Sequence, residues 1–215
     1  MTTHSAIHLH GFFRSSASWR VRIALALKGL SYSQHTYKLR AQEQRSASYL
    51  AMNPQGLVPT LEMDGAVLTQ SLAIIEYLDE THPAPPLIGI TALERARVRA
   101  FALAIACDIH PVQNLKILAR LQAMGHSEDE AHGWARDFTA LGLDACDKLL
   151  AQSQGPYCFG ARPSLADICL IPQLANARRF GVDLKWQRLL DVEAHCLAQP
   201  AFRETAPDRQ PDFVA

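Results

Sequence analysis

The proline-rich segment His82-Pro83-Ala84-Pro85-Pro86-Leu87 constrains the fold more than any other feature of the 215-residue chain. Apolar residues before it recur with periods of two and of about 3.6, whereas the helical period predominates after it. Three prolines within six residues make a stiff connection, because proline fixes φ and lacks a backbone N–H. The sequence therefore predicts an α/β domain over residues 1–82, a linker over 83–90 and an all-α domain over 91–215.

The first predicted domain has the order β-α-β, a loop with a short helix, then β-β-α. Its expected elements are strands at 7–9 and 32–39, a helix at 19–28 ended by Gly29, and a strand pair around Asp64-Gly65. Asp-Gly between two apolar runs is a strong signal for a tight hairpin. Ser71 is placed to cap a further helix that ends before Pro83. This order predicts a small mixed α/β unit.

The second predicted domain begins its helices with cap-like patterns. A Ser or Thr three residues before a Glu or Asp lets the two side chains bind orphan N–H groups at a helix start. Such patterns occur at Thr91–Glu94, Ser127–Glu130 and Ser164–Asp167, and a final helix is expected at 185–198. Asp167 is therefore interpreted as part of a cap and not as a catalytic acid. Pro111 is expected to bend the first of these helices, because it removes an internal hydrogen bond.

Composition excludes several classes of protein. Lys plus Arg and Asp plus Glu both number 21, so the net charge is zero and neither a nucleic-acid binder nor an acidic-membrane binder is expected. No apolar run approaches the roughly 20 residues that span a bilayer. The start Met1–Ser5 lacks the pattern of a signal peptide, so a cytoplasmic location is expected. Five cysteines without a C-x-x-C pair and nine scattered histidines predict no metal site.

Hydroxyl side chains gather in the segment Arg14-Ser15-Ser16-Ala17-Ser18-Trp19-Arg20, where a strand is expected to lead into a helix. The start of a helix favours an anion, because its first N–H groups are unpaired and the helix dipole is positive there. The serines can cap the helix, or they can donate hydrogen bonds to a bound group. The sequence alone is consistent with both helix capping and ligand binding.

Val58-Pro59 leads into an expected strand, where proline cannot donate to the sheet ladder. A cis bond at the start of the strand would leave the Val58 backbone able to pair with a bound peptide. An ordinary trans proline on an edge strand is the alternative.

The arrangement resembles the glutathione transferase superfamily, in which a thioredoxin-like domain precedes an all-helical domain. The segments that carry the resemblance are Ser15-Ser16-Ala17-Ser18-Trp19-Arg20-Val21-Arg22-Ile23-Ala24-Leu25, Asn53-Pro54, Val58-Pro59-Thr60-Leu61, the run from Gln70 to Leu78, and the segment around Asp167. The first is similar to the signature of the zeta class, the maleylacetoacetate isomerases. Glutathione-dependent maleylpyruvate isomerase is a close relative. The class signature has a cysteine where this chain has Ala17.

The resemblance implies glutathione as cofactor and assigns roles to individual residues. Catalytic roles fall to Ser15, Ser16 and Arg179, with the Ser15 hydroxyl holding the glutathione sulfur as a thiolate. The implied glutathione contacts are Ser15, Ser16, Gln44, Val58, Gln70, Ser71, His110 and Asn114. The implied substrate contacts are Arg14, Lys116 and Arg179. His110 and Asn114 are four residues apart and would share a helix face if the helix continues through Pro111.

The implied reaction is cis-trans isomerisation of a maleyl dicarboxylic keto acid by reversible thiolate addition. Maleylacetoacetate belongs to tyrosine and phenylalanine breakdown, and maleylpyruvate to the gentisate route. The resemblance also implies a homodimer. Two alternatives are glutathione transfer to α-haloacids and a non-catalytic binding protein on the same fold. A thiol oxidoreductase is disfavoured, because the first 106 residues contain no cysteine.

Overall fold

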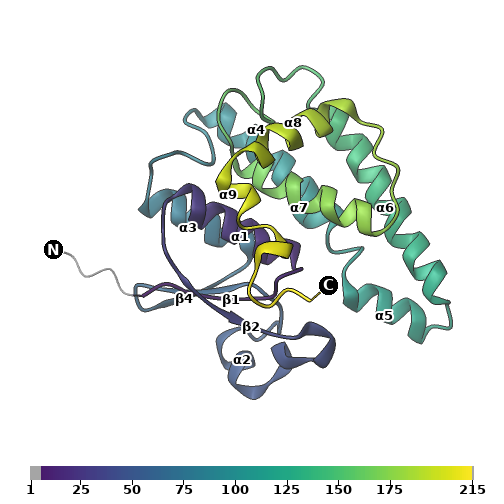
Figure 1. Cartoon of the computed structure of the whole chain (residues 1–215). Helices are drawn as coiled ribbons and strands as arrows, with labels where there is room; N and C mark the ends of the chain where they lie inside the picture. Colours follow the sequence, from purple (N-terminus) through teal and green to yellow (C-terminus); the bar gives the residue numbers. More distant parts are fainter. Residues whose placement is uncertain (1–5, 215) are drawn as a thin grey trace. The chain divides into compact units, whose positions relative to one another are not determined.

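The chain divides into two compact units in the computed structural model, which describes residues 6–214 (Figure 1). The first unit comprises Met1–Pro86 together with Gln199–Ala215, and the second comprises Leu87–Ala198. The boundary therefore falls within the predicted linker. The predicted helical domain, 91–215, is wrong at its end, because helix α9 (Pro200–Arg203) packs against α1 (Ser16–Leu27) of the first unit.

The first unit is built on a four-stranded mixed sheet with the order β2-β1-β3-β4. Its strands are β1 (His8–Gly11), β2 (Ser33–Thr36), β3 (Thr60–Met63) and β4 (Ala66–Thr69). β1 and β2 are parallel, and the other two pairs are antiparallel. Besides α1 it contains α2 (Ala47–Met52), α3 (Ser71–Thr81) and the 3-10 turns η1 (Leu39–Ala41), η2 (Glu43–Arg45) and η4 (Pro207–Arg209). Figure 1 shows α1 and α3 above the sheet and α2 below it. The predicted thioredoxin-like order is confirmed.

Two turns in this unit have the backbone that the sequence predicts. Asp64 and Gly65, between β3 and β4, have φ values of 51° and 78°, the left-handed conformation that a tight hairpin needs at both positions. Gly29 follows α1 with φ 66°, as is common just after a helix.

The two faces of the sheet differ in polarity, because side chains alternate along each strand. Leu9 of β1 pairs with Leu61 of β3, and both are fully buried apolar residues. His10 and Thr60, one position along, form the next pair and lie on the opposite face.

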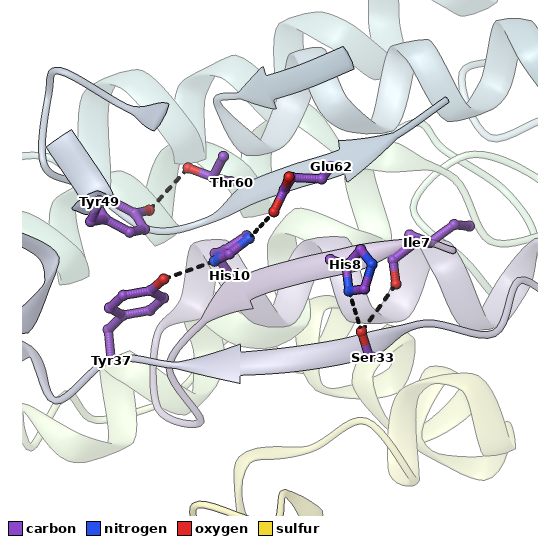
Figure 2. A network of polar contacts seen from close by, with 8 residues as sticks. All are labelled: Ile7, His8, His10, Ser33, Tyr37, Tyr49, Thr60 and Glu62. Atoms are coloured by element: carbon purple, nitrogen blue, oxygen red, sulfur yellow. Dashed lines mark hydrogen bonds and ion pairs between the residues drawn. The ribbon is translucent and has the colours of Figure 1, made fainter. Parts of the chain in front are cut away.

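The polar face holds a hydrogen-bonded network that joins three strands to α2 (Figure 2). His10 Nε2 lies 2.6 Å from Glu62 Oε1, and His10 Nδ1 lies 2.9 Å from the Tyr37 hydroxyl. The Tyr49 hydroxyl of α2 donates to the Leu57 carbonyl at 2.7 Å. The same Tyr49 hydroxyl lies 3.0 Å from Thr60 Oγ1 of β3, and this contact attaches α2 to the sheet.

The second unit is helical. Its elements are α4 (Ala92–Leu103), the π-helical segment η3 (Ala104–Ile109), α5 (Leu115–Ala123), α6 (Glu128–Leu149), α7 (Leu165–Arg179) and α8 (Gln187–Ala198). Capping boxes start α4 at Thr91, α6 at Ser127 and α7 at Ser164. All three predicted caps are therefore confirmed. α7 supplies much of the core, since its residues from Leu165 to Leu174 are all buried.

The segment around Pro111 differs from the prediction. The first helix of this unit widens into η3, which ends at Ile109, and a turn follows. Asn114 then caps α5, with its Oδ1 accepting from the Lys116 N–H at 3.4 Å. Pro111 therefore lies between two helices and does not bend one. As a result His110 and Asn114 do not share a helix face.

Within residues 6–214, no helix combines the length and apolarity needed to cross a membrane. The same residues contain no group of three or more His, Cys, Asp or Glu arranged to hold a metal ion.

Candidate functional site

Ser15 lies at the N-cap of α1, directly after the loop that follows β1. Its Oγ accepts a hydrogen bond from the Ser18 N–H at 3.2 Å. A hydroxyl has two acceptor lone pairs and one donor hydrogen, so this bond leaves the Ser15 hydrogen able to donate to another group. Capping and ligand binding are thus compatible at this residue. Ser16 is the first helical residue and is buried.

The loop before Ser15 is held by a buried arginine that the sequence analysis did not identify. Arg22 donates to the carbonyls of Phe13 at 2.8 Å, Thr205 at 3.0 Å and Phe12 at 3.4 Å. Burial lowers the pKa of Arg22 to about 10, so its guanidinium remains protonated at neutral pH. Arg22 therefore connects the C-terminal segment to the loop that positions Ser15.

The start of α3 brings two further predicted glutathione contacts together. Gln70 occupies the N-cap with φ 68° and makes no capping hydrogen bond with its side chain, so the prediction that Ser71 caps this helix is wrong. Ser71 is instead the first helical residue, and its N–H belongs to the first turn, where N–H groups have no partner within the helix. The Gln70 amide donates to Gln55 Oε1 at 2.8 Å. An anion would be stabilised at this helix start.

Arg20 of α1 lies behind Ser71. Its side chain is 1% exposed, and Nη1 donates to Ser71 Oγ at 3.4 Å. Its Nε and Nη2 are buried and have no hydrogen-bond partner among the described residues. Arg20 belongs to the serine-rich segment 14–20, and the sequence alone assigns it no role.

Val58 and Gln44 complete the predicted glutathione contacts of the first unit. The Val58–Pro59 peptide bond is cis, which decides between the two alternatives that the sequence left open. The preceding Leu57 carbonyl accepts from Tyr49 and from Asn53 Nδ2, both at 2.7 Å. Gln44 is buried in η2, and its Oε1 lacks a hydrogen-bond partner within the described chain. An unpaired buried amide oxygen can accept a ligand N–H.

The predicted arginine contacts for the substrate differ in their surroundings. Arg178, which precedes the predicted contact Arg179 and is not itself a predicted contact, forms two hydrogen bonds with the Glu193 carboxylate at 2.6 and 2.5 Å. Arg179, at the end of α7, is exposed, and its guanidinium carbon lies 4.7 Å from the centre of the Phe180 ring. Arg14 in the first unit is also exposed, 5.7 Å from the Phe13 ring centre. A guanidinium held against a ring can still bind a carboxylate through its edge.

The remaining predicted contacts belong to the second unit. His110 is half-buried in the turn after η3, and Asn114 is half-buried at the cap of α5. Lys116 is exposed in the first turn of α5. Their assigned roles stay predictions.

Two models of protein-family domains match the chain. Residues 9–86 match the model of the glutathione S-transferase N-terminal domain, and residues 140–195 match that of the C-terminal domain. A maleylacetoacetate isomerase of Pseudomonas aeruginosa is 47% identical over 211 residues, which cover 96% of this chain and 99% of that protein.

Solved structures agree with the sequence comparison. A maleylpyruvate isomerase described as a bacterial glutathione S-transferase of the zeta class has a TM-score of 0.94 at 43% identity, covering 96% of this chain and all of that one (100%). A maleylacetoacetate isomerase of Anaeromyxobacter dehalogenans with glutathione bound in its active site has a TM-score of 0.87 at 43% identity, covering 96% and 97% of the two chains. The chain belongs to the glutathione S-transferase family, in its zeta class.

Proposed function

We propose that the protein is a glutathione-dependent cis-trans isomerase of a maleyl dicarboxylic keto acid. The observation that carries the proposal is the Ser15 hydroxyl at the start of α1, which caps the helix and retains a hydrogen to donate. The described part of the first unit contains no cysteine, so a thiol used there must come from a bound molecule. Relatives with this architecture are named maleylacetoacetate and maleylpyruvate isomerases.

Residues of the first unit fit glutathione. Bound glutathione would supply a thiolate for reversible addition to the cis double bond of the substrate. Ser15 donates a hydrogen bond to the sulfur, and the N-terminus of α1 stabilises its negative charge. The start of α3 at Ser71 offers N–H donors to a carboxylate. The buried Gln44 oxygen offers an acceptor for an amide N–H.

The substrate carries two carboxylates, and we assign Arg179 to one of them. Its guanidinium can make two parallel hydrogen bonds to a carboxylate. We assign Arg14 and Lys116 to the other end of the substrate, and His110 and Asn114 to glutathione. We further propose a cytoplasmic homodimer that serves either tyrosine and phenylalanine breakdown or the gentisate route.

Ser15→Ala tests the proposal, with Ser127→Ala as a matched control. Both serines are N-caps whose Oγ accepts from an N–H at 3.2 Å, so each variant loses about 1 kcal/mol of stability. Only Ser15→Ala is expected to lower kcat/KM for a maleyl acid, by about 10²-fold or more, as removal of a donor to a developing or stabilised anion does. It should also raise the pKa of the bound glutathione thiol in the pH–rate profile.

Two results would contradict the proposal. One is full activity in Ser15→Ala. The other is consumption of glutathione in proportion to product, which would indicate transfer to an electrophile such as an α-haloacid. Assays of maleylacetoacetate, maleylpyruvate and chlorofluoroacetate with catalytic amounts of glutathione separate these activities.

A further inference from the structure

We propose that Arg20 is a positioning residue for the carboxylate at the γ-glutamyl end of glutathione, and that it acts through Ser71. The inference rests on the proposed function, because it names the group that the start of α3 binds. It adds a buried cation to a subsite whose other members are polar but uncharged.

The first observation is the burial of a guanidinium without a counter-charge. Arg20 is 1% exposed. Among residues 6–214 its Nε and Nη2 have no hydrogen-bond partner, and no carboxylate lies within ion-pair distance of it. A buried charge is costly unless it is paired and hydrogen-bonded. The described residues thus supply no anion to neutralise the Arg20 guanidinium.

A second cation on the same helix shows the ordinary arrangement. Lys28, two turns further along, is also buried against α3, but its Nζ lies 2.7 Å from the Asp79 carboxylate. It further donates to the carbonyls of His82 and Pro85, both at 2.6 Å. Lys28 is therefore fully satisfied within the chain. The contrast indicates that the missing partner of Arg20 is specific to the start of α3.

The geometry at Ser71 indicates where the missing anion binds. Nη1 of Arg20 donates to Ser71 Oγ at 3.4 Å, so this oxygen uses a lone pair toward Arg20 and its hydrogen must point to another acceptor. The Ser71 N–H lies in the first turn of an 11-residue helix, where the dipole is positive. A carboxylate bound at the start of α3 would therefore meet two donors, the Ser71 hydroxyl and the Ser71 N–H. The helix dipole and the Arg20 guanidinium would both stabilise its negative charge.

Two ligands that differ only in this carboxylate test the inference. One is glutathione, and the other is γ-aminobutyryl-cysteinyl-glycine, which is glutathione without the α-carboxylate of its γ-glutamyl residue. The measured quantity is the ratio of their Kd values, determined by titration calorimetry. We expect the unaltered protein to prefer glutathione by about 10-fold or more, as for other charge-assisted hydrogen bonds.

Arg20→Met should reduce this ratio to within about threefold of unity, because the charge and the orientation of the Ser71 hydroxyl are both lost. Lys28→Met is the matched control: it removes a buried cation from the same helix interface and should lower the thermal unfolding midpoint without changing the ratio. Ser71→Ala keeps the guanidinium and removes the hydroxyl that it orients. It should also lower the ratio, and it serves as the test if Arg20→Met does not fold.

An unchanged ratio in Arg20→Met, or in Ser71→Ala where only that variant folds, overturns the inference, as does an equal loss of the ratio in Lys28→Met. If the role of Arg20 is overturned in this way but the unaltered protein binds glutathione, the proposed function is not contradicted. Failure of the unaltered protein to bind glutathione would overturn both.

Discussion

Gly142 lies in the middle of α6 and allows the last residue of η3, Ile109, to pack against it. A Cβ added at Gly142 would lie closer than 3.0 Å to both Cγ1 and Cδ1 of Ile109. Ile109 is 2% exposed, so its side chain has no open space into which it can move. We therefore expect Gly142→Ala to destabilise the protein, although alanine is intrinsically favoured over glycine in a helix.

The size and sign of the effect of Gly142→Ala follow from two opposing terms. Overpacking a core costs about 1–3 kcal/mol, and replacing glycine by alanine inside a helix returns about 1 kcal/mol. Gly142→Ala should therefore lower the free energy of unfolding by up to about 2 kcal/mol. Ile109→Ala removes both clashing atoms and costs about 2–5 kcal/mol by itself. In that background Gly142→Ala should become stabilising by about 1 kcal/mol, because only the helix term and cavity filling remain.

Urea unfolding of the four proteins, followed by circular dichroism, measures this reversal. Gly133→Ala is the control, since it lies on the same helix and its added Cβ would approach nothing closer than Arg136 Nη2 at 3.7 Å. It should stabilise both backgrounds. If Gly142→Ala has the same sign with and without Ile109, the packing argument is refuted.

Three other perturbations test separate parts of the structure. Arg22→Met removes the side-chain donor to the carbonyls of Phe13 and Thr205, and one of the two donors to the Phe12 carbonyl. It should lower the free energy of unfolding by about 3 kcal/mol and weaken glutathione binding; an unaltered Kd would contradict the positioning role. The pKa of Glu130 is lowered from 4.5, chiefly by the Ser127 N–H. The ionised Glu130 carboxylate therefore stabilises the fold above pH 4.5, and this stabilisation is lost as the pH falls through the lower pKa of the folded state. In urea titrations, Glu130→Gln should lose less stability than the unaltered protein between about pH 6 and about pH 3. Of the five cysteines only Cys107 is exposed, and burial raises the pKa of Cys146 to about 12; a thiol reagent should modify one residue in the native protein and five after unfolding.

Local signals predicted the elements that depend on local physics. The Asp64-Gly65 turn and the three capping boxes are set by a few neighbouring residues, and each appears where the sequence places it. The cap of α3 was misassigned by one residue, because Gln70 adopts a left-handed φ that a side-chain pattern does not reveal for glutamine.

Contacts between distant residues could not be predicted in this way. The return of the C-terminal segment to the first unit depends on bonds such as that from the Phe13 N–H to Asp212 Oδ2, across 199 positions of sequence. Pro172 lies inside α7, where a local rule would end the helix, because burial on all sides of that helix outweighs one missing hydrogen bond. The unpaired nitrogens of Arg20 likewise become visible only once its depth in the fold is known.

The serine-rich segment 14–20 acts as one unit, because its residues contact different parts of the protein from the first two turns of α1. Ser15 caps the helix, Trp19 donates through its indole N–H to Thr205 at 3.1 Å, and Arg20 reaches the start of α3. Arg22 holds both the loop before the cap and the Thr205 carbonyl. The contacts of Trp19, Arg20 and Arg22 fix the helix against the C-terminal segment, the start of α3 and the loop before the cap, so together they determine where the N-terminus of α1 points. A thiolate held by one hydroxyl and one helix end depends on that direction, because both interactions weaken steeply with misalignment. The motif therefore specifies the orientation of the helix as much as the chemistry at its cap.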